Sequence, residues 1–497
     1  MKVTTANEMR AAEEAAAKHG LGSEILMETA GHAIALELLR RLPTRPRVLV
    51  VAGPGQNGGD GLTAARHLLA RAAEVHVWLL GVPGRLRGAA KLQWQRLQGS
   101  PGVHWIQAEG WPSGRFDGAI DAIFGTSLRG ELAGHALRAV RYLEAVGVPV
   151  VSADLPSGVL GDTGAIAGTA VRATCTVALG ALKPGHLFWP GRSYCGEIVL
   201  EPLGLEPQWL EPARLHTVEE LAGPAIAPTA GKGAYGRTVI VAGSAQYPGA
   251  AWLAARGALR GGSGLTVLAS VAAVLAHAAA MPEVIERQLQ ARGGVIDPSV
   301  LRPETLRDAT SVVIGPGLGR MDLQGLGHWL RLYLGLHRPL VLDADGLRPI
   351  QGRLDVLRRR PGPTVLTPHA GEAGRLLGRA VADDAPSRLQ AACEIAERSG
   401  AVVLLKGHPT FVAAPHGPVG IVDRGGPELA TGGTGDVLSG ALGAQLAQGF
   451  AARSAAERAA LAHALAGASL RGQLRRGGLA SEIADHLPAA FGGSVDA

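Results

Sequence analysis

Two glycine-rich loops, far apart in the chain, carry the residues best suited to chemistry. The first is GPGQNGGDG at residues 53–61, and the second is TGGTGDVLSG at residues 431–440. Successive glycines let backbone N–H groups point into one concavity, where they can hold a phosphate or another negative charge. In the second loop Asp436 follows the glycines, and we expect a helix to begin there. Its carboxylate could take a proton from an attacking hydroxyl while the N–H groups stabilise the developing charge. The alternative is a simple helix cap.

The first loop contains a literal match to the dinucleotide fingerprint G-x-G-x-x-G, at Gly53, Gly55 and Gly58. That fingerprint also requires an acidic residue at the end of the second strand, where it holds a ribose. The second predicted strand ends at Leu80, and Glu74 precedes it. The sequence therefore argues against a redox Rossmann domain. It favours a phosphate-cradling turn, with a tight strand–helix turn that binds nothing as the alternative.

Oxygen-bearing side chains follow two further predicted strands of the same half. Asp121 begins the segment DAIFGTSLRG, and Asp154 begins DLPSG. Ligands of open α/β sheets bind at the carboxyl ends of the strands, so we expect both aspartates to converge on one crevice with Asn57 and Ser157. Carboxylate, amide and hydroxyl oxygens suit a hard cation better than zinc. For Asp154 a helix N-cap is the plainer interpretation.

Four motifs of the second half each close a predicted strand and should line one edge of a sheet. They are GPGLG at residues 315–319, LDADGL at 342–347, TPHAGE at 367–372 and LLKGHPT at 404–410. Lys406 can pair with a phosphate, and the N–H groups that follow it can add contacts. His369 is either a structural polar residue or a substrate contact. Asp343 and Asp345 are interpreted as loop-capping residues outside the catalytic set.

Apolar runs that alternate with helical stretches must position these loops. In the first half they occupy residues 47–52, 75–80, 118–124 and 148–153; in the second half, residues 237–242, 265–269, 311–314, 339–342, 364–366 and 401–405. This alternation predicts α/β domains with parallel sheets covered on both faces. Because residues 201–229 are rich in proline, we predict a domain of residues 1–212, a linker of residues 213–228 and a second domain of residues 229–497.

Composition sets outer limits on the function. A chain of 497 residues with 47% hydrophobic and 18% charged residues is too apolar for a disordered protein. The net charge of +6 and the aromatic share of 4% give little support to nucleic-acid binding. Three cysteines fit neither a disulfide framework nor a zinc site, which indicates a reducing cytoplasm.

Two segments could be mistaken for targeting or membrane sequences. Glu13 and Glu14 lie where a signal peptide would have its apolar core. Residues 261–282 carry no charge, but their opening glycines and His277 favour a strand at 265–269 and a buried helix over a membrane span. We therefore expect a cytoplasmic protein without a membrane partner.

The motifs of the first half resemble the NAD(P)H-hydrate epimerase family. NGGDG, DAIFGT and DLPSG occur in that family's order and spacing, together with LMETAG at residues 26–31 and Lys183 in LGALKPG. The resemblance covers about residues 5–210. It implies a Rossmann-like three-layer fold that binds hydrated NADH or NADPH, and Asp154 as the acid/base that lets the R and S hydrates interconvert. The implied potassium ligands are Asn57, Asp121 and Ser157. The implied substrate contacts are Gln56, Asn57, Gly58, Gly59, Asp60, Gly125, Thr126, Ser127, Leu128, Arg129, Gly130, Glu131 and Asp154. Gln56 and Ser127 depart from the residues common in the family.

The second half resembles the ribokinase-like fold, and more narrowly the ADP- or ATP-dependent NAD(P)H-hydrate dehydratase family. The matching segments are KGAYGRTVIVAGS at residues 232–244, PGAAWLAA, TPHAGE and GGTGD, and the resemblance covers about residues 225–490. It implies phosphorylation of the hydrate's ring hydroxyl by ADP or ATP with Mg²⁺, followed by loss of phosphate. The implied nucleotide contacts are Lys406, Gly407, His408, Pro409, Thr410 and Gly435. The implied hydrate contacts are Ala250, Gly317, His369 and Asp436. Gly231 stands where the family often has histidine.

Together the two resemblances predict a bifunctional repair enzyme for hydrated nicotinamide nucleotides, expected to form a homo-oligomer. Its nucleotide, ADP or ATP, and its preference between the two hydrates stay open. One alternative is a ribokinase-like small-molecule kinase with a non-catalytic N-terminal binding domain. The other is a first domain that serves only as a scaffold.

Overall fold

The chain folds into two compact units, which the computed structural model describes over residues 1–71, 73–221, 229–276, 281–471 and 477–492. The first unit is Met1–Leu215 and the second is His216–Ala497. The division lies inside the predicted linker of residues 213–228. Part of that segment is regular, since Leu215–Thr217 form strand β9, and residues 222–228 lie outside the described residues.

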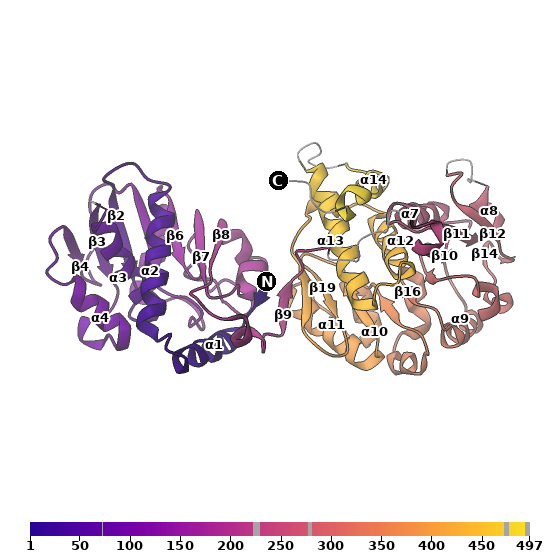
Figure 1. Cartoon of the computed structure of the whole chain (residues 1–497), viewed down its shortest axis with the longest axis horizontal. Helices are drawn as coiled ribbons and strands as arrows, with labels where there is room; N and C mark the ends of the chain where they lie inside the picture. Colours follow the sequence, from indigo (N-terminus) through magenta and orange to yellow (C-terminus); the bar gives the residue numbers. More distant parts are fainter. Residues whose placement is uncertain (72, 222–228, 277–280, 472–476, 493–497) are drawn as a thin grey trace. The chain divides into compact units, whose positions relative to one another are not determined.

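The first unit is built on one parallel sheet with the strand order β4-β3-β2-β5-β6-β7-β8 (Figure 1). In chain order these strands are β2 (Arg47–Ala52), β3 (Glu74–Leu79), β4 (Val103–Ile106), β5 (Gly118–Ala122), β6 (Val150–Ala153), β7 (Cys175–Leu179) and β8 (Glu197–Glu201). The chain runs outward from β2 to β4 on one side and from β5 to β8 on the other. The strand order therefore reverses between β2 and β5, where an open sheet presents its ligand crevice.

Helices cover both faces of this sheet, which explains why β2 is apolar throughout. Val48 and Val50 pack into one hydrophobic cluster and Leu49 and Val51 into the other, as alternation along a strand requires. The first cluster lies beneath α1 (Ala6–Lys18), α2 (Ser23–Leu39), α3 (Gln56–Leu69) and α4 (Gly88–Leu97), and the second beneath α5 (Gly134–Ala145). The predicted three-layer Rossmann-like fold is confirmed.

The second unit contains a larger sheet with the order β9-β20-β19-β18-β17-β16-β15-β10-β11-β12. In chain order these strands are β9, β10 (Arg237–Val241), β11 (Leu265–Ser270), β12 (Ile285–Gln288), β15 (Ser311–Ile314), β16 (Leu340–Leu342), β17 (Thr364–Leu366), β18 (Val402–Leu405), β19 (Thr410–Ala413) and β20 (Val419–Val422). The strands from β12 to β18 are parallel, and β19 and β20 add to them antiparallel. Here the strand order reverses between β10 and β15.

A buried helix, α12 (Thr434–Ala447), lies at the centre of the second unit. It packs tightly on α7 (Pro248–Arg260), since a Cβ added at Gly440 would lie 1.9 Å from the carbonyl oxygen of Ala254. The remaining helices are α8 (Ala272–Leu275), α9 (Leu323–Gly335), α10 (Ala370–Leu377), α11 (Ala385–Ser399), α13 (Ala452–Leu470) and α14 (Ala480–Phe491). This α/β architecture confirms the predicted ribokinase-like class.

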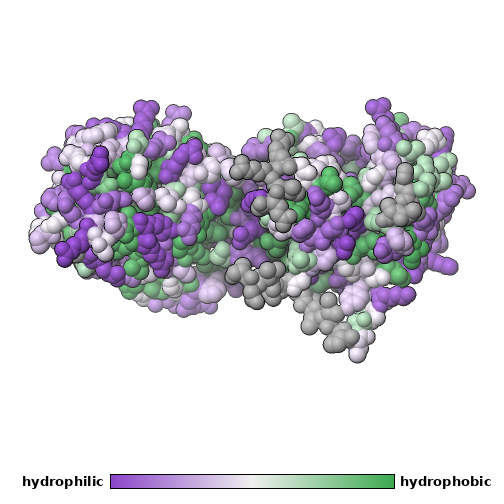
Figure 2. Space-filling model, turned by 90° about the horizontal axis from the view of Figure 1, so that it is seen from above, coloured by the Kyte–Doolittle hydropathy of each residue, from purple (hydrophilic) through white to green (hydrophobic). Residues whose placement is uncertain are grey.

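The uncharged segment of residues 261–282 forms β11 and then the short helix α8. Two residues of α8 are buried and two are exposed, so the helix is shorter and less buried than predicted; residues 277–280 lie outside the described part. Of the helices that the structure describes, none has the length and apolarity to cross a bilayer. Figure 2 shows hydrophilic side chains spread over the visible face, with hydrophobic ones in patches between them.

Candidate active sites

The first candidate site is a cavity of about 420 Å³ at the carboxyl ends of β2, β5 and β6. It lies where the strand order reverses, and the sequence predicted a crevice at the carboxyl ends of the strands. Several predicted substrate contacts line it, namely Gln56, Asn57, Asp60, Gly125, Thr126, Ser127 and Asp154. Glu13 from α1 and Lys183 also line the cavity, and the sequence analysis had assigned no role to either.

The first loop needs glycines because its backbone lies too close to neighbouring backbone atoms to leave room for a side chain. A Cβ at Gly53 would lie 2.1 Å from the carbonyl oxygen of Ile123, and one at Gly58 would lie 1.9 Å from the carbonyl oxygen of Gly53. The turn is therefore tight, and it brings α3 down beside β5. A Cβ at Gly125 would lie 2.7 Å from Asp154 Oδ2 and 3.1 Å from Asn57 Oδ1, so these two side chains meet at the Gly125 backbone.

Asp154 occupies a strained backbone position at the end of β6. Its φ is 65°, and Leu155 N donates to Ala153 O across it at 2.8 Å, which closes a γ-turn. Such a conformation is disfavoured for a residue with a side chain and persists only where the surroundings enforce it. His186 contributes to that enforcement, because its Nε2 donates to the Asp154 carbonyl oxygen at 2.6 Å.

The Asp154 side chain forms a buried ion pair with Lys183. Lys183 Nζ donates to Asp154 Oδ1 and, at 2.6 Å, to the carbonyl oxygen of Leu179. The Lys183 side chain is 1% exposed and the Asp154 side chain 10%. One carboxylate oxygen is thus fixed by the ammonium, while Oδ2 lies beside Gly125 in the cavity wall.

The protonation states around this ion pair follow from burial. Burial and the Lys183 charge lower the pKa of His186 to about 4. His186 is therefore neutral near pH 7, with its Nδ1 accepting from Lys183 N at 2.9 Å. Burial raises the pKa of Asp60 well above its usual range, and the nearby carboxylates of Asp154 and Glu13 raise it further. The cavity thus holds several carboxyl groups in different environments, which is typical of acid/base sites.

Asp121 lies fully buried at the end of β5 and is suited to a cation. It accepts hydrogen bonds from Ser157 Oγ at 2.6 Å, Ser157 N at 2.8 Å and Ser152 Oγ at 2.8 Å. In the described part of the chain no ion pair includes Asp121, and burial raises its pKa. The amide oxygen of Asn57, which lies beside Gly125, is a further oxygen atom that could bind a cation. Oxygen atoms and an uncompensated buried carboxylate fit the hard cation that the sequence predicted.

The remaining predicted contacts of the first unit lie outside the lining of the cavity. Gly58 and Gly59 are buried in α3. Leu128 is buried in the hydrophobic cluster beneath α5. Arg129, Gly130 and Glu131 are exposed, and Arg129 Nη1 donates to the carbonyl oxygens of Thr126 and Leu128 at 2.8 Å. The structure therefore places residues 128–131 as support for the loop, and their substrate contacts stay predictions.

The second candidate site surrounds the start of α12. The helix begins at Thr434, two residues before the predicted start at Asp436, because Thr434 and Gly435 already have helical conformation after Gly433, whose φ is 93°. Asp436 therefore lies in the first helical turn, near the N–H groups that the glycine loop leaves without side-chain caps. Burial raises the pKa of Asp436 to about 7, the negative charges of Asp343 and Glu372 raise it, and Lys406 lowers it.

Lys406, at the end of β18, reaches the start of the same helix. Its Nζ lies 2.8 Å from Asp343 Oδ1 and 3.9 Å from Glu372 Oε2, and a Cβ at Gly435 would lie 3.5 Å from Nζ. Asp343 is 1% exposed and also accepts from Thr367 Oγ1 at 2.8 Å. Its interpretation as a loop cap is thus incomplete, since it is the ion-pair partner of the site's lysine. Asp345 does cap a loop, because its Oδ2 accepts from Gly319 N at 2.9 Å.

The other predicted contacts of the second unit surround this centre. His369 is the N-cap of α10, where its Nδ1 accepts from Gly371 N at 3.0 Å, and its side chain is 54% exposed. Gly317, with φ 61°, packs on α7, since a Cβ there would lie 2.9 Å from the Cβ of Ala250. Arg388 stabilises the loop of residues 407–410, because it donates to the carbonyl oxygens of His408 at 2.6 Å and Pro409 at 2.7 Å. Thr410 Oγ1 donates to Gly407 O at 2.9 Å.

Comparison with known proteins identifies relatives of both units. Residues 238–489 match the family model described as NAD(P)H-hydrate dehydratase, and residues 23–185 match the model described as YjeF-related protein N-terminus. The bifunctional NAD(P)H-hydrate repair enzyme of Thermofilum pendens is 37% identical over 505 residues, which cover 99% of this chain and 96% of that protein. The enzyme of the same name from Gloeobacter violaceus is 40% identical over 448 residues, which cover 86% of this chain and 85% of that protein.

Two solved structures each match part of the chain. An ADP/ATP-dependent NAD(P)H-hydrate dehydratase from Bacillus subtilis, co-crystallised with ATP and Mg²⁺, is 28% identical with a TM-score of 0.48; it covers 54% of this chain, and 93% of its own chain is matched. A yeast protein is 27% identical with a TM-score of 0.33, covering 37% of this chain with 83% of its own.

Proposed function

The chain belongs to the family of bifunctional NAD(P)H-hydrate repair enzymes, and from this premise we propose how its two units act. The first unit interconverts the R and S epimers of hydrated NADH or NADPH. The second dehydrates the S epimer to NADH or NADPH at the expense of ADP or ATP, releasing phosphate and AMP or ADP. The observation that carries this proposal is a largely buried carboxylate at the substrate edge of each sheet, Asp154 in one and Asp436 in the other.

In the first unit Asp154 is the acid/base for epimerisation. To invert the carbon that bears the added hydroxyl, a bond at that carbon must break and re-form on the other face. Either direction moves a proton to or from the hydroxyl. Lys183 holds Oδ1, which leaves Oδ2 beside Gly125 to exchange that proton. The residues of the cavity lining that the sequence predicted as substrate contacts then position the ring.

Asn57, Asp121 and Ser157 are the residues that would hold a potassium ion beside this cavity. The buried Asp121 carboxylate has hydroxyl and N–H partners and no cation among the described residues, so a monovalent cation would balance its charge. A bound K⁺ would supply a fixed positive charge behind the loop of residues 123–127.

In the second unit Asp436 is the base for phosphoryl transfer. As the hydrate's ring hydroxyl attacks the terminal phosphorus of the nucleotide, Asp436 takes its proton, and the bond from phosphorus to the departing AMP or ADP breaks. Phosphate then leaves from the ring with the bonding electrons, and a proton lost from the neighbouring ring carbon restores the double bond. Hydroxide is a poor leaving group and phosphate a good one, which explains why a kinase-like site serves a dehydration.

Lys406 and the N–H groups before α12 are placed to hold the transferring phosphoryl group. Lys406 Nζ lies near Gly435, so its ammonium and the helix N-terminus face the same space. Residues 406–410 are the proposed nucleotide contacts. The carboxylates of Asp343, Glu372 and Asp436 offer oxygen atoms of the type that Mg²⁺ prefers, and Mg²⁺ would arrive on the nucleotide phosphates. We further propose a cytoplasmic location, consistent with three cysteines in the thiol form, and a homo-oligomer.

Absorbance at the reduced-nicotinamide band tests the whole proposal. Purified protein is mixed with R and S hydrates of NADH, Mg²⁺, K⁺ and either ADP or ATP. We expect complete recovery of NADH with at least one of the two nucleotides, and that nucleotide is the phosphoryl donor. Recovery that stops at the S fraction would contradict the assignment of the first unit. If neither nucleotide gives recovery while a simple alcohol is phosphorylated, the kinase alternative is correct.

A further inference from the structure

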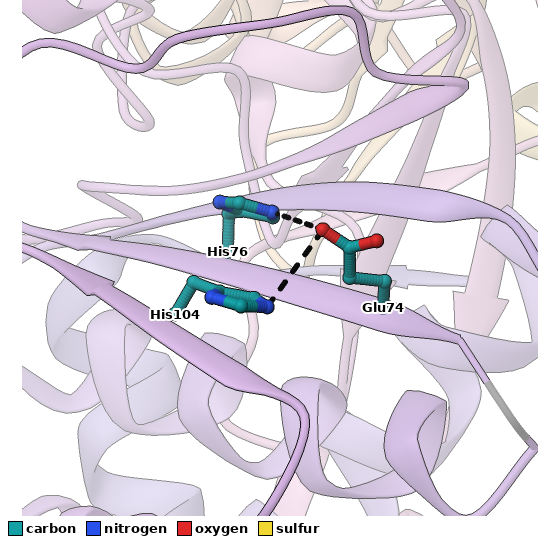
Figure 3. A group of neighbouring side chains, drawn as sticks. All are labelled: Glu74, His76 and His104. Atoms are coloured by element: carbon teal, nitrogen blue, oxygen red, sulfur yellow. Dashed lines mark hydrogen bonds and ion pairs between the residues drawn. The ribbon is translucent and has the colours of Figure 1, made fainter.

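A cluster of two histidines and one glutamate lies on the first unit's sheet (Figure 3). Glu74 and His76 are two residues apart on β3, so their side chains point to the same face. His104 on the edge strand β4 is the direct parallel partner of His76. Glu74 is the first residue of β3, whereas the epimerase cavity lies at the carboxyl ends of the strands. The cluster is therefore separate from the proposed catalytic machinery.

The three side chains converge on one point. His76 Nε2 lies 2.7 Å and His104 Nε2 lies 3.7 Å from the same atom, Glu74 Oε1, and the ligand atoms of all three residues lie within 4.8 Å of one another. The two imidazole rings stack with centroids 4.5 Å apart and an interplanar angle of 19°, which keeps both Nε2 atoms on one side. Small rotations of these rings would bring the three atoms to the separations found around a tetrahedral metal ion.

The cluster is buried on one side and open on the other. The His76 side chain is 10% exposed and packs edge-on against Phe116, whereas the side chains of Glu74 and His104 are 48% and 55% exposed. A metal ion could therefore enter from solvent and keep water at a further coordination position. The buried side chain of His76 is held in place, whereas the exposed side chains of Glu74 and His104 can adjust. This arrangement suits an ion that binds after the chain has folded.

A protein cation already occupies part of this position. Arg47 Nε donates to Glu74 Oε1 and to His76 Nε2, both at 3.0 Å. His76 Nε2 also lies 2.7 Å from Glu74 Oε1, so a metal ion, which needs the lone pair of this nitrogen, would displace both the Arg47 N–H and any proton that Nε2 shares with Glu74. The Arg47 side chain is 33% exposed, lies over the Phe116 ring and donates from Nη1 to the carbonyl oxygen of Arg115 at 3.4 Å, contacts that it would give up when a metal ion binds. A positive charge is thus already stabilised at the point where the three ligands meet.

We propose that Glu74, His76 and His104 bind a divalent transition metal, with Zn²⁺ as the best fit, and that this ion displaces the Arg47 guanidinium. Imidazole and carboxylate are ligands of Zn²⁺, which tolerates the irregular geometry that solvent-exposed side chains would give. The bound ion would connect the edge strand β4 to β3. Its role would be to stabilise the sheet edge, with no part in either repair reaction.

Calorimetric titration of the tag-free, full-length protein with Zn²⁺ at neutral pH tests this proposal. We expect one Zn²⁺ to bind per chain, and we expect His104→Ala to weaken binding at least about tenfold, since even residues behind the ligands contribute that much. Arg47→Gln removes the competing cation and should strengthen binding. His135→Ala is the matched control, because His135 is also exposed and pairs with Glu109 at 3.8 Å on the same unit; it should bind like the unchanged protein.

Three outcomes would overturn the proposal. They are no stoichiometric Zn²⁺ binding by the unchanged protein, equal binding by the His104→Ala and His135→Ala variants, and weaker binding by a folded Arg47→Gln variant. Circular dichroism without metal establishes that each variant is folded. Co²⁺ provides a second readout, because its visible absorption reports imidazole and carboxylate coordination and should be lost with His104→Ala.

Discussion

Asp154 and Asp436 hold corresponding positions in the two units but are stabilised in different ways. Each follows a strand or loop at the carboxyl edge of a largely parallel sheet. Asp154 lies on a strained γ-turn and is ion-paired with the buried Lys183. Asp436 lies in the first turn of a rigid helix, and the lysine of its site pairs with Asp343 instead.

The difference shows two routes to a working acid/base. In the first unit an ammonium fixes one carboxylate oxygen and compensates its charge within a buried site. In the second unit the lysine pairs with Asp343. Burial and the charges of Asp343 and Glu372 raise the pKa of Asp436 to about 7, although Lys406 lowers it. A base whose pKa lies near the working pH both accepts and releases a proton readily. Phosphoryl transfer requires this of the group that takes the proton from the attacking hydroxyl. The variants below should separate these two routes.

The largest expected effect is on dehydration when Asp436 is replaced by Asn. Loss of a general base should lower the rate about 10²–10⁴-fold.

The same substitution should also change stability. Because the folded pKa of Asp436 lies above its ordinary value of 3.8, ionisation of its carboxyl group lowers the stability of the folded protein. That cost is absent below pH 3.8, grows as the pH rises toward 7 and is complete above it. After allowance for solvent screening, Asn should therefore stabilise the protein by about 1–2 kcal/mol at pH 8 and by less at pH 5.

Thermal unfolding and single-turnover kinetics check these two expectations together. Binding of ATP should persist in the Asp436→Asn variant, since residues 406–410 are untouched. A variant that dehydrates the S hydrate at the normal rate would remove Asp436 from its role. A variant that is less stable at pH 8 would contradict the account of its raised pKa.

The next largest effect is on stability when Lys183 is replaced by Met. This leaves the Asp154 carboxylate buried without its partner, which should cost about 3–5 kcal/mol and abolish epimerisation. Urea denaturation measures the loss. Lys91→Met is the matched control at an exposed position and should stay within about 0.5 kcal/mol of the unchanged protein. If the double variant Lys183→Met, Asp154→Asn is no more stable than Lys183→Met alone, the ion pair is not the cause of the loss.

A smaller effect concerns the pH dependence of dehydration. The rate should rise with pH as Asp436 loses its proton, with the acid limb centred near pH 7. Asp343 raises the pKa of Asp436, so Asp343→Asn should move the limb to lower pH by about 1 unit. Lys406 lowers it, so Lys406→Met should move the limb to higher pH. Rate profiles report the position of the limb even where the maximal rate falls, and shifts in the same direction would contradict this electrostatic account.

The smallest effect should follow Ser157→Ala in the first unit. The hydroxyl donates to Asp121 Oδ1 and accepts from Phe124 N at 3.0 Å, so its loss should weaken K⁺ stimulation of epimerisation by about tenfold. Dehydration should be unchanged. Ser193→Ala, at an exposed serine of the same unit, should have no effect on K⁺ dependence. Equal K⁺ dependence in both variants would argue against the proposed ligands.

The comparison also shows what a sequence can predict. The strands at residues 47–52, 311–314 and 364–366 were predicted to the residue, since continuous apolar runs between turns have few alternatives. The motifs at residues 315–319, 342–347, 367–372 and 404–410 were predicted to line one sheet edge, because each closes a predicted strand. The sequence did not predict that Thr434 and Gly435 belong to the helix. Whether such loop residues join the following helix depends on the packing of α12 on α7, which the local sequence does not reveal.

Residues that act through distant partners were harder to predict. Asp343 was interpreted as a cap, and its pairing with Lys406 depends on β16 and β18 being separated only by β17. Lys183 belongs to the LGALKPG motif, but its contact with Asp154, 29 positions away, appears only in the fold. For Glu74 and His76 a signal was present, because residues two apart on a strand share a face, but His104 required the strand order.

The most direct test of two separate carboxylate sites uses Asp154→Asn and Asp436→Asn, alone and mixed, on R and S hydrates with the productive nucleotide. We expect Asp154→Asn to restore NADH rapidly from the S fraction only, and Asp436→Asn to restore almost none. An equal mixture of the two variants should repair both epimers, since the S hydrate released by one chain can diffuse to the other. Rapid, complete repair by either variant alone would contradict the assignment of its carboxylate, and a mixture that stops at the S fraction would contradict the independence of the two sites.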